Sequence, residues 1–181
     1  DRERRYVIPS APGKRGPDDY KITDLLYLCH TNVQHGVSFD HVFQIISERY
    51  LSIAGDLDLS TDLQPVLERI RTEIAGGAPA DYVASRGEYL SGRILADYLG
   101  YDFIDPADLI HFDSYGSYDA EQTGRDLRRG LAPHETAVIP GFYGSTPDGQ
   151  VKTFSRGGSD ITGAIVAHVV GADLYENWTD V

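Results

Sequence analysis

One stretch of the chain combines glycines, a cation and a helix start in a way that suits an anionic ligand. Its residues are Phe154-Ser155-Arg156-Gly157-Gly158-Ser159-Asp160, and they run directly into a helical pattern. Glycines let the backbone approach a ligand closely, and the free N–H groups at a helix N-terminus attract an anion. Arg156 adds a planar guanidinium that fits a carboxylate or a phosphate. The stretch predicts an anion-binding turn; the alternative is a flexible hairpin exit in which Ser159 is a plain helix cap.

Two other places have side chains that could contact a ligand. The first is Ser10-Ala11-Pro12-Gly13-Lys14, whose N–H groups, hydroxyl and ammonium group suit phosphate. It matches neither G-x-x-x-x-G-K-[ST] nor G-x-G-x-x-G, so an ordinary turn stays open. The second is Ser85-Arg86-Gly87-Glu88, where a glycine interrupts a helical pattern and so favours close approach by another group. Glu88 would there hold an ammonium group, or it is simply solvated on a helix surface.

Spacing and composition argue against several other chemistries. The 6 His residues form no H-E-x-x-H or comparable pair, so no metal site is predicted. The single Cys, Cys29, cannot form an internal disulfide, which favours a reducing, cytoplasmic setting. The net charge is −12, which disfavours nucleic acid, and no apolar run approaches the roughly 20 residues of a membrane helix. We therefore expect small-molecule partners, with no nucleic acid and no membrane.

The elements that position these residues alternate between helix and strand patterns. Helices are expected from Thr23 as N-cap to Gly36, from Ser38 to Ile53, and over 63–74, 80–99 and 121–131, with a last one capped by Ser159. Strands are expected over 6–8, 101–104, 109–112, 136–139 and 174–178, with a hairpin over 144–155. This α/β pattern implies a mainly parallel sheet covered by helices on both faces. Because ligands bind at the carboxyl ends of such strands, we expect the site after Ile8, after Ile139 and at Thr179-Asp180.

Five motifs occur in an order and spacing that are typical of one family of enzymes. The first consists of Ser10-Ala11 with Gly13 together with Thr23-Asp24-Leu25-Leu26, and the second is Gly87-Glu88 followed by Leu90-Ser91. The later ones are Ile139-Pro140-Gly141-Phe142-Tyr143-Gly144, the stretch from Thr153 to Thr162, and Trp178-Thr179-Asp180-Val181. Together they resemble the signatures of aspartate kinases, in the amino acid kinase superfamily. The resemblance spans nearly the whole chain and implies the three-layer α/β/α fold of that superfamily.

The resemblance implies a definite reaction. Aspartate kinases transfer the terminal phosphoryl group of ATP to the side-chain carboxylate of L-aspartate, giving 4-phospho-L-aspartate, the first step of lysine, threonine and methionine biosynthesis. A carboxylate nucleophile is ionised near neutral pH, so the reaction needs charge neutralisation and in-line positioning more than a general base. We expect magnesium (Mg2+) to accompany ATP. Two alternatives stay open: a superfamily member acting on glutamate or acetylglutamate, and a non-catalytic aspartate-binding module.

The resemblance also assigns roles to individual residues. The implied substrate-binding residues are Thr23, Glu88, Arg156, Gly157, Gly158 and Ser159. Arg156 would pair with a carboxylate of aspartate, and Glu88 would take its ammonium group. The implied nucleotide-binding residues are Ser10, Thr179 and Asp180. Asp160 would act in catalysis by organising the family's catalytic lysine.

The family pattern extends past both ends of this sequence. A strand carrying Lys-Phe-Gly-Gly, whose lysine stabilises the transferring phosphoryl group, would precede Asp1. The rest of the nucleotide-binding region and the regulatory ACT domains would follow Val181. We therefore expect residues 1–181 to form a single, partial catalytic domain, inactive by itself and derived from a homo-oligomeric parent.

Overall fold

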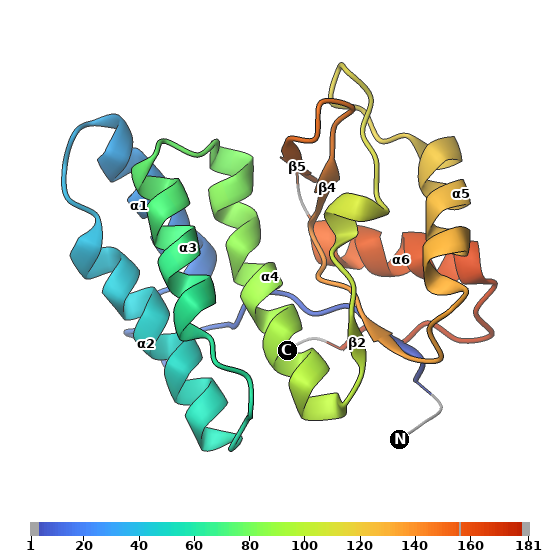
Figure 1. Cartoon of the computed structure of the whole chain (residues 1–181), viewed down its shortest axis with the longest axis horizontal. Helices are drawn as coiled ribbons and strands as arrows, with labels where there is room; N and C mark the ends of the chain where they lie inside the picture. The colour runs from blue at the N-terminus through green and yellow to red at the C-terminus, as the bar shows by residue number, and fades with distance from the viewer. Residues whose placement is uncertain (1–3, 156, 179–181) are drawn as a thin grey trace.

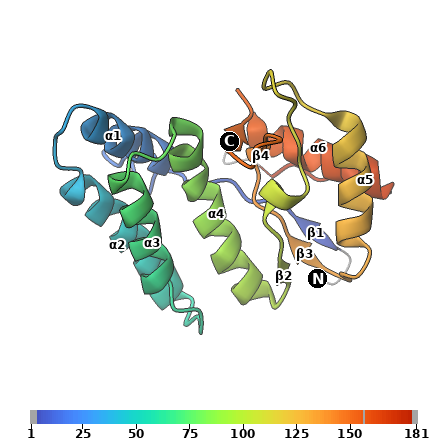
Figure 2. The same cartoon turned by 45° about the horizontal axis from the view of Figure 1, so that its top comes forward.

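A small parallel sheet lies between two groups of helices in the computed structural model, which describes residues 4–155 and 157–178 (Figures 1 and 2). In strand order the sheet contains β1 (Tyr6–Val7), β3 (Ala137–Val138) and β2 (Asp102–Phe103). Both outer strands pair with β3 in parallel, and Tyr6 and Asp102 lie opposite the same residue, Ala137. This arrangement confirms the expected mainly parallel sheet.

The helices cover the two faces of the sheet unequally. One side holds α1 (Ile22–Gln34), α2 (Asp40–Asp56), α3 (Gln64–Ala75) and α4 (Ala80–Leu99), and the other holds α5 (Ala120–Leu131) and α6 (Gly158–Val170) (Figures 1 and 2). These bounds confirm the predicted helices to within a few residues. Gly100, with a φ of 67°, ends α4 in the left-handed conformation that glycine adopts without strain. None of the helices in the described ranges has the length and apolar character needed to cross a membrane.

Two hydrophobic cores follow from this layering. The larger lies among α1–α4, and each of these helices contributes a fully buried side chain to it, namely Leu26, Ile46, Ile70 and Leu90. The smaller lies between the sheet and α5 and α6, and includes Leu127, Ile139 and Val166. Each of these two apolar clusters is therefore built by a different group of helices.

An antiparallel hairpin joins the sheet region to α6. It pairs β4 (Tyr143–Ser145) with β5 (Val151–Thr153), which confirms the hairpin predicted over 144–155. Side chains of the hairpin are fastened to α4, since Asp81 accepts hydrogen bonds from Lys152 Nζ at 2.9 Å and Thr153 Oγ1 at 2.8 Å. The hairpin therefore fixes where α6 begins relative to α4.

Both predicted helix caps are wrong. Thr23 lies inside α1, whose N-cap is Lys21, and Ser159 lies inside α6, whose N-cap is Gly157. Gly157 has a φ of 58°, a conformation that a glycine adopts freely, so the helix starts two residues earlier than a serine cap would place it.

Two of the predicted strands do not form in the described chain. The segment 109–112 follows a 3₁₀ turn (Pro106–Asp108) and makes isolated bridges, from His111 to Ser145 and from Phe112 to Tyr118. The segment 174–178 has no regular secondary structure, and Leu174 and Trp178 are 73% and 78% exposed. The segment 109–112 meets β4 only at its last residue, Ser145, and the described residues place no strand beside 174–178, so neither apolar run is extended into a ladder.

Candidate functional site

The loops that follow β1 and β3 lie side by side. The backbone N–H of Ile139 donates to the carbonyl of Val7 at 2.9 Å, and that of Gly141 donates to the carbonyl of Pro9 at 3.0 Å. Parallel strands bring their carboxyl ends to the same edge of a sheet, which is where ligands bind in α/β folds. The two loops that the sequence singled out therefore meet at this edge.

The N-terminus of α6 packs against the second of these loops through glycines. A Cβ atom on Gly141 would lie 2.5 Å from Ser159 Oγ, and one on Gly158 would lie 2.5 Å from Phe142 Cδ2. Thr162 Oγ1 accepts a hydrogen bond from the Phe142 backbone at 3.1 Å and donates one to the Gly158 carbonyl at 2.8 Å. Phe142 has a φ of 84°, an uncommon conformation for a bulky residue and one often found at functional sites. Side chains at these glycines would displace the helix start.

A cavity of about 200 Å³ opens where these elements meet. It is lined by Ser10, Thr23, Glu88, Phe142, Gly157, Gly158, Ser159 and Asp160. The sequence prediction named all of these except Phe142, which directly follows the loop glycine Gly141 after β3. Arg156, Thr179 and Asp180 lie outside the described residues. The structure thus brings together residues from α1, α4, α6 and the β1 loop.

Glu88 is the most unusual side chain in this cavity. Its residue is 6% exposed, and its Oε2 atom is buried without a hydrogen-bond partner among the described residues. Burial raises the pKa of the carboxyl to about 7, against smaller opposing effects of a hydrogen bond from the backbone of Ala11 and of the nearby Arg86 charge. These facts rule out a glutamate solvated on a helix surface. A buried carboxylate with an unpartnered oxygen is suited to a cationic ligand group.

The part of the cavity formed by α6 offers backbone donors beside a second carboxylate. Gly158, Ser159 and Asp160 form the first turn of α6, where backbone N–H groups and the helix dipole favour an anion. Asp160 accepts a hydrogen bond from Asn177 Nδ2 at 3.3 Å. The cavity therefore combines two carboxylates, Glu88 and Asp160, with the N–H groups of a helix N-terminus, which suits a small zwitterion such as an amino acid.

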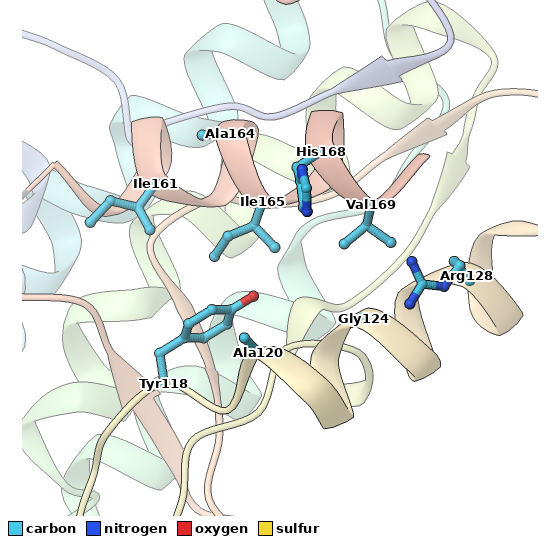
Figure 3. Close-up of a pocket in the computed structure, with 9 residues that line it drawn as sticks. All are labelled: Tyr118, Ala120, Gly124, Arg128, Ile161, Ala164, Ile165, His168 and Val169. Carbon is cyan, nitrogen blue, oxygen red and sulfur yellow. The ribbon is translucent and has the colours of Figure 1, made fainter. Parts of the chain in front are cut away.

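A larger groove of about 430 Å³ lies between α5 and α6, and its lining has different chemistry (Figure 3). Ile161, Ile165 and Val169 on α6 face α5 and Tyr118 across it, with Arg128 near Val169 (Figure 3). No carboxylate lines this groove. Among the residues that the structure describes, no group of three His, Cys, Asp or Glu side chains converges as a metal site would require. The smaller cavity is therefore the candidate active site.

Its fold and cavity define an α/β protein with a cavity suited to a small charged ligand, at the carboxyl edge of a parallel sheet and against a helix N-terminus. Comparison with known proteins makes the assignment more specific. The chain belongs to the amino acid kinase family, whose family profile matches residues 23–181. This match confirms the family that the motifs indicated.

Relatives of this chain include several aspartate kinases. It is 35% identical to aspartokinase 3 of Bacillus subtilis (strain 168) over its full length, covering 43% of that protein. Its structure is similar to that of the aspartate kinase of Clostridium acetobutylicum, with 54% identity, a TM-score of 0.97, and coverage of 100% of this chain and 42% of that one. The complex of Escherichia coli aspartokinase III with aspartate and ADP shares the fold, at 24% identity and a TM-score of 0.81, over 98% of this chain and 42% of that one. The chain thus spans less than half the length of these relatives.

Proposed function

We propose that this chain forms the aspartate-binding part of an aspartate kinase. The observation that carries the proposal is Glu88, a buried carboxylate with an unpartnered oxygen that lines the same cavity as the α6 N-terminus. The ammonium group of L-aspartate would satisfy that oxygen and return the carboxyl to its ionised form. Similarity to the Bacillus and Clostridium enzymes supports the same substrate.

The proposed ligand contacts divide the cavity between substrate and nucleotide. Glu88 binds the ammonium group of aspartate and Thr23 helps to hold the substrate. The turn formed by Gly157, Gly158 and Ser159 binds a carboxylate through its backbone, and the motif resemblance adds Arg156 to that role. Ser10 lies toward the phosphates of ATP. We also propose, from the motifs alone, that Thr179 and Asp180 bind the nucleotide and that Asp160 organises the catalytic lysine.

The proposed reaction is an in-line displacement at phosphorus. An oxygen of the aspartate side chain forms a bond to the γ-phosphorus of ATP as the bond from that phosphorus to the β–γ bridging oxygen breaks. ADP leaves with the bridging oxygen, and the product is 4-phospho-L-aspartate. Because the nucleophile is already a carboxylate, no residue has to remove a proton from it. The residues of the cavity therefore act by orienting two anions and neutralising their charge.

Magnesium would enter this site with the ATP phosphates. The described residues contain no converging set of ligands for it. No step of the reaction is therefore assigned to the ion. It would supply additional neutralisation of phosphate charge, as divalent ions do in other kinases.

We place this chain as one partial catalytic domain of a cytoplasmic, homo-oligomeric enzyme whose partners are aspartate and ATP, with no nucleic acid or membrane. The product would enter lysine, threonine and methionine biosynthesis. The cytoplasmic setting is supported by Cys29, which is buried and whose thiol has a pKa raised by burial to about 12. Such a thiol is inert and needs no oxidising compartment.

Substitution of Glu88 tests the proposal with a pair of matched ligands. L-Aspartate and succinate carry the same two carboxylates, but succinate lacks the ammonium group. In Glu88→Gln, we expect aspartate affinity measured by calorimetry to fall at least tenfold, which is about 1.4 kcal/mol, while succinate binding is unchanged or stronger. Glu48→Gln, an exposed substitution on α2, serves as the control and should bind both ligands as the original chain does.

Two outcomes would contradict this assignment. If the original chain does not prefer aspartate to succinate, Glu88 does not hold an ammonium group. If glutamate or acetylglutamate binds more tightly than aspartate, the protein is a different kinase of the family. Aspartate-dependent ADP formation by a protein of the relatives' full length then separates an enzyme from a non-catalytic binding module.

A further inference from the structure

Arg49 on α2 is a buried cation that the proposed reaction does not use. The residue is 2% exposed, and its Nη2 donates to both carboxylate oxygens of Asp19 at 2.6 Å. Its Nη1 donates to the backbone carbonyl of Gly13 at 3.1 Å. Its Nε has no hydrogen-bond partner among the described residues. A buried ion pair of this kind contributes little net stability compared with apolar packing, so stability alone does not account for it.

Asp19, the partner of Arg49, organises the segment that leaves β1. Its carboxylate accepts hydrogen bonds from the backbone N–H of Arg15 at 2.8 Å and of Tyr20 at 3.0 Å. The Arg15 hydrogen bond, followed by that of Tyr20 and the charge of Arg49, lowers the pKa of Asp19 to about 2. Asp19 is therefore ionised at any pH at which the chain is studied. The pair with Arg49 closes this segment into a fixed loop.

The start of the same segment reaches the candidate active site. Ser10 lines the cavity, and the backbone of Ala11 donates a hydrogen bond to the carboxyl of Glu88. The loop also rests directly on α4, because a Cβ atom on Gly87 would lie 2.9 Å from the Cβ of Ala11. In Figure 1 this dark-blue segment runs from the sheet past α4 to the helical layer.

Tyr50, the residue after Arg49, holds α4, which is the other partner in the contact between the loop and Gly87. The hydroxyl of Tyr50, which is fully buried, donates to the backbone carbonyl of Gly87 at 2.7 Å. Two adjacent residues of α2 thus fix two neighbouring parts of the site. Arg49 fixes the loop that carries Ser10 and Ala11, and Tyr50 fixes α4 next to Glu88.

We propose that Arg49 is a positioning residue for the substrate cavity: through Gly13 and Asp19 it sets where Ser10 and Ala11 meet Glu88. This inference rests on the proposed function of the cavity. It gives α2 a part in substrate binding, although α2 contributes no residue to the cavity lining.

Three substitutions test whether the contacts of Arg49 with Gly13 and Asp19 position the loop, and a fourth serves as the control. Arg49→Met removes the charge and all three hydrogen bonds. Arg49→Lys keeps the charge without the planar fork, and Asp19→Asn removes the partner's charge at nearly constant shape. Ile46→Val, in the same buried face of α2 one turn earlier, destabilises the core without touching the loop. Two quantities are measured for each variant: the Kd for L-aspartate by calorimetry, and the pKa of Glu88 by carbon-detected NMR without ligand.

The Glu88 titration has defined neighbours. Among the residues that the structure describes, the titratable and charged groups near it are Tyr27 on α1, Tyr50 on α2, Arg86 on α4 and, in the lining of the same cavity, Asp160 on α6. None of them is changed in the variants. A shift in the Glu88 titration therefore reports on the Ala11 hydrogen bond.

We expect the Kd for aspartate to rise at least tenfold in Arg49→Met and Asp19→Asn, and less in Arg49→Lys. We expect the pKa of Glu88 to rise in the same order, because loss of the Ala11 hydrogen bond disfavours the ionised carboxyl. Ile46→Val should lower the melting temperature and leave both quantities unchanged. The proposal would be overturned if Asp19→Asn folds, binds aspartate with a Kd within twofold of the original chain and leaves the Glu88 titration unchanged. This test does not depend on whether Arg49→Met folds. If the original chain fails to bind aspartate, the proposed function is wrong. The Glu88 titration then still tests whether Arg49 positions the loop that carries Ala11.

Discussion

Glu88 links the chemistry of the cavity to the stability of the chain. Its pKa is raised by burial from 4.5 to about 7, so the folded chain keeps a proton that the unfolded chain has already lost between these values. Stability therefore falls as the pH rises through this window and levels off above pH 7, which is the opposite of a salt-bridged carboxylate. At 1.36 kcal/mol per unit, the full effect is roughly 3 kcal/mol.

Comparison of Glu88→Gln with the original chain isolates this effect. We expect equal stabilities near pH 4 and a variant that is more stable by up to roughly 3 kcal/mol at pH 8. The measurement is urea denaturation at a series of pH values, with and without aspartate. Saturating aspartate should remove the pH dependence in the original chain, because its ammonium group compensates the carboxylate. A difference between the two proteins that does not change with pH would show that Glu88 does not titrate in this range.

At the level of residues, the sequence identified the residues that line the cavity better than those that hold them in place. Glu88 stands out because it follows a glycine that interrupts a helical pattern, and the glycine turn stands out because two glycines directly precede a helix. Arg49 and Asp19 are 30 positions apart, and nothing in local spacing pairs them. One signal was available: Arg49 interrupts the apolar helical spacing of Ile46, Tyr50 and Ile53, and a charge on a buried face requires a partner.

Among the elements, α4 owes its contact with the β1 loop to a glycine. In Gly87→Ala the added methyl group would lie 2.9 Å from the Cβ of Ala11, so the loop must move away from α4. We expect a loss of about 1–3 kcal/mol in unfolding free energy and weaker aspartate binding, since Ala11 leaves Glu88. Denaturant melts and calorimetry measure the two effects.

Gly55→Ala on α2 is the matched control for this substitution. An added Cβ there would meet no atom within 4 Å, so helix propensity should stabilise the chain by up to about 1 kcal/mol without changing aspartate binding. If both alanine variants bind aspartate equally well, the seating of the loop on α4 is unimportant for the site.

The elements also show what local patterns can and cannot predict. Helices α1–α4 were predicted well because their apolar spacing persists over three or more turns. The segments 109–112 and 174–178 have the composition of strands, but strand formation depends on a partner elsewhere in the chain. The start of α6 was misplaced for a different reason, because Gly157 rather than Ser159 takes the N-cap position.

For the molecule as a whole, the net charge of −12 opposes compactness. Salt screens this repulsion, since the Debye length falls from about 30 Å at 0.01 M to about 8 Å at 0.15 M. The Arg49–Asp19 pair is partly buried and is screened much less, and the exposed ion pairs contribute little.

We therefore expect the melting temperature to rise by roughly 2–4 °C between 10 and 150 mM salt, the shift that about 1 kcal/mol produces in a chain of this size. Calorimetric scans in NaCl and in KCl would exclude an effect of one particular cation. A melting temperature that falls with added salt would mean that surface ion pairs outweigh the general repulsion.

The position of the cavity between the two hydrophobic cores has a mechanical consequence. Thr23 and Glu88 belong to helices of the larger core, whereas Gly158, Ser159 and Asp160 belong to α6 of the smaller one. A ligand bound there would contact both groups of helices, which also meet directly where α4 packs against the sheet and against the β4–β5 hairpin. An event elsewhere in the protein that moves one group of helices relative to the other would change the affinity for the ligand. By thermodynamic linkage, bound ligand then opposes that movement with the same free energy.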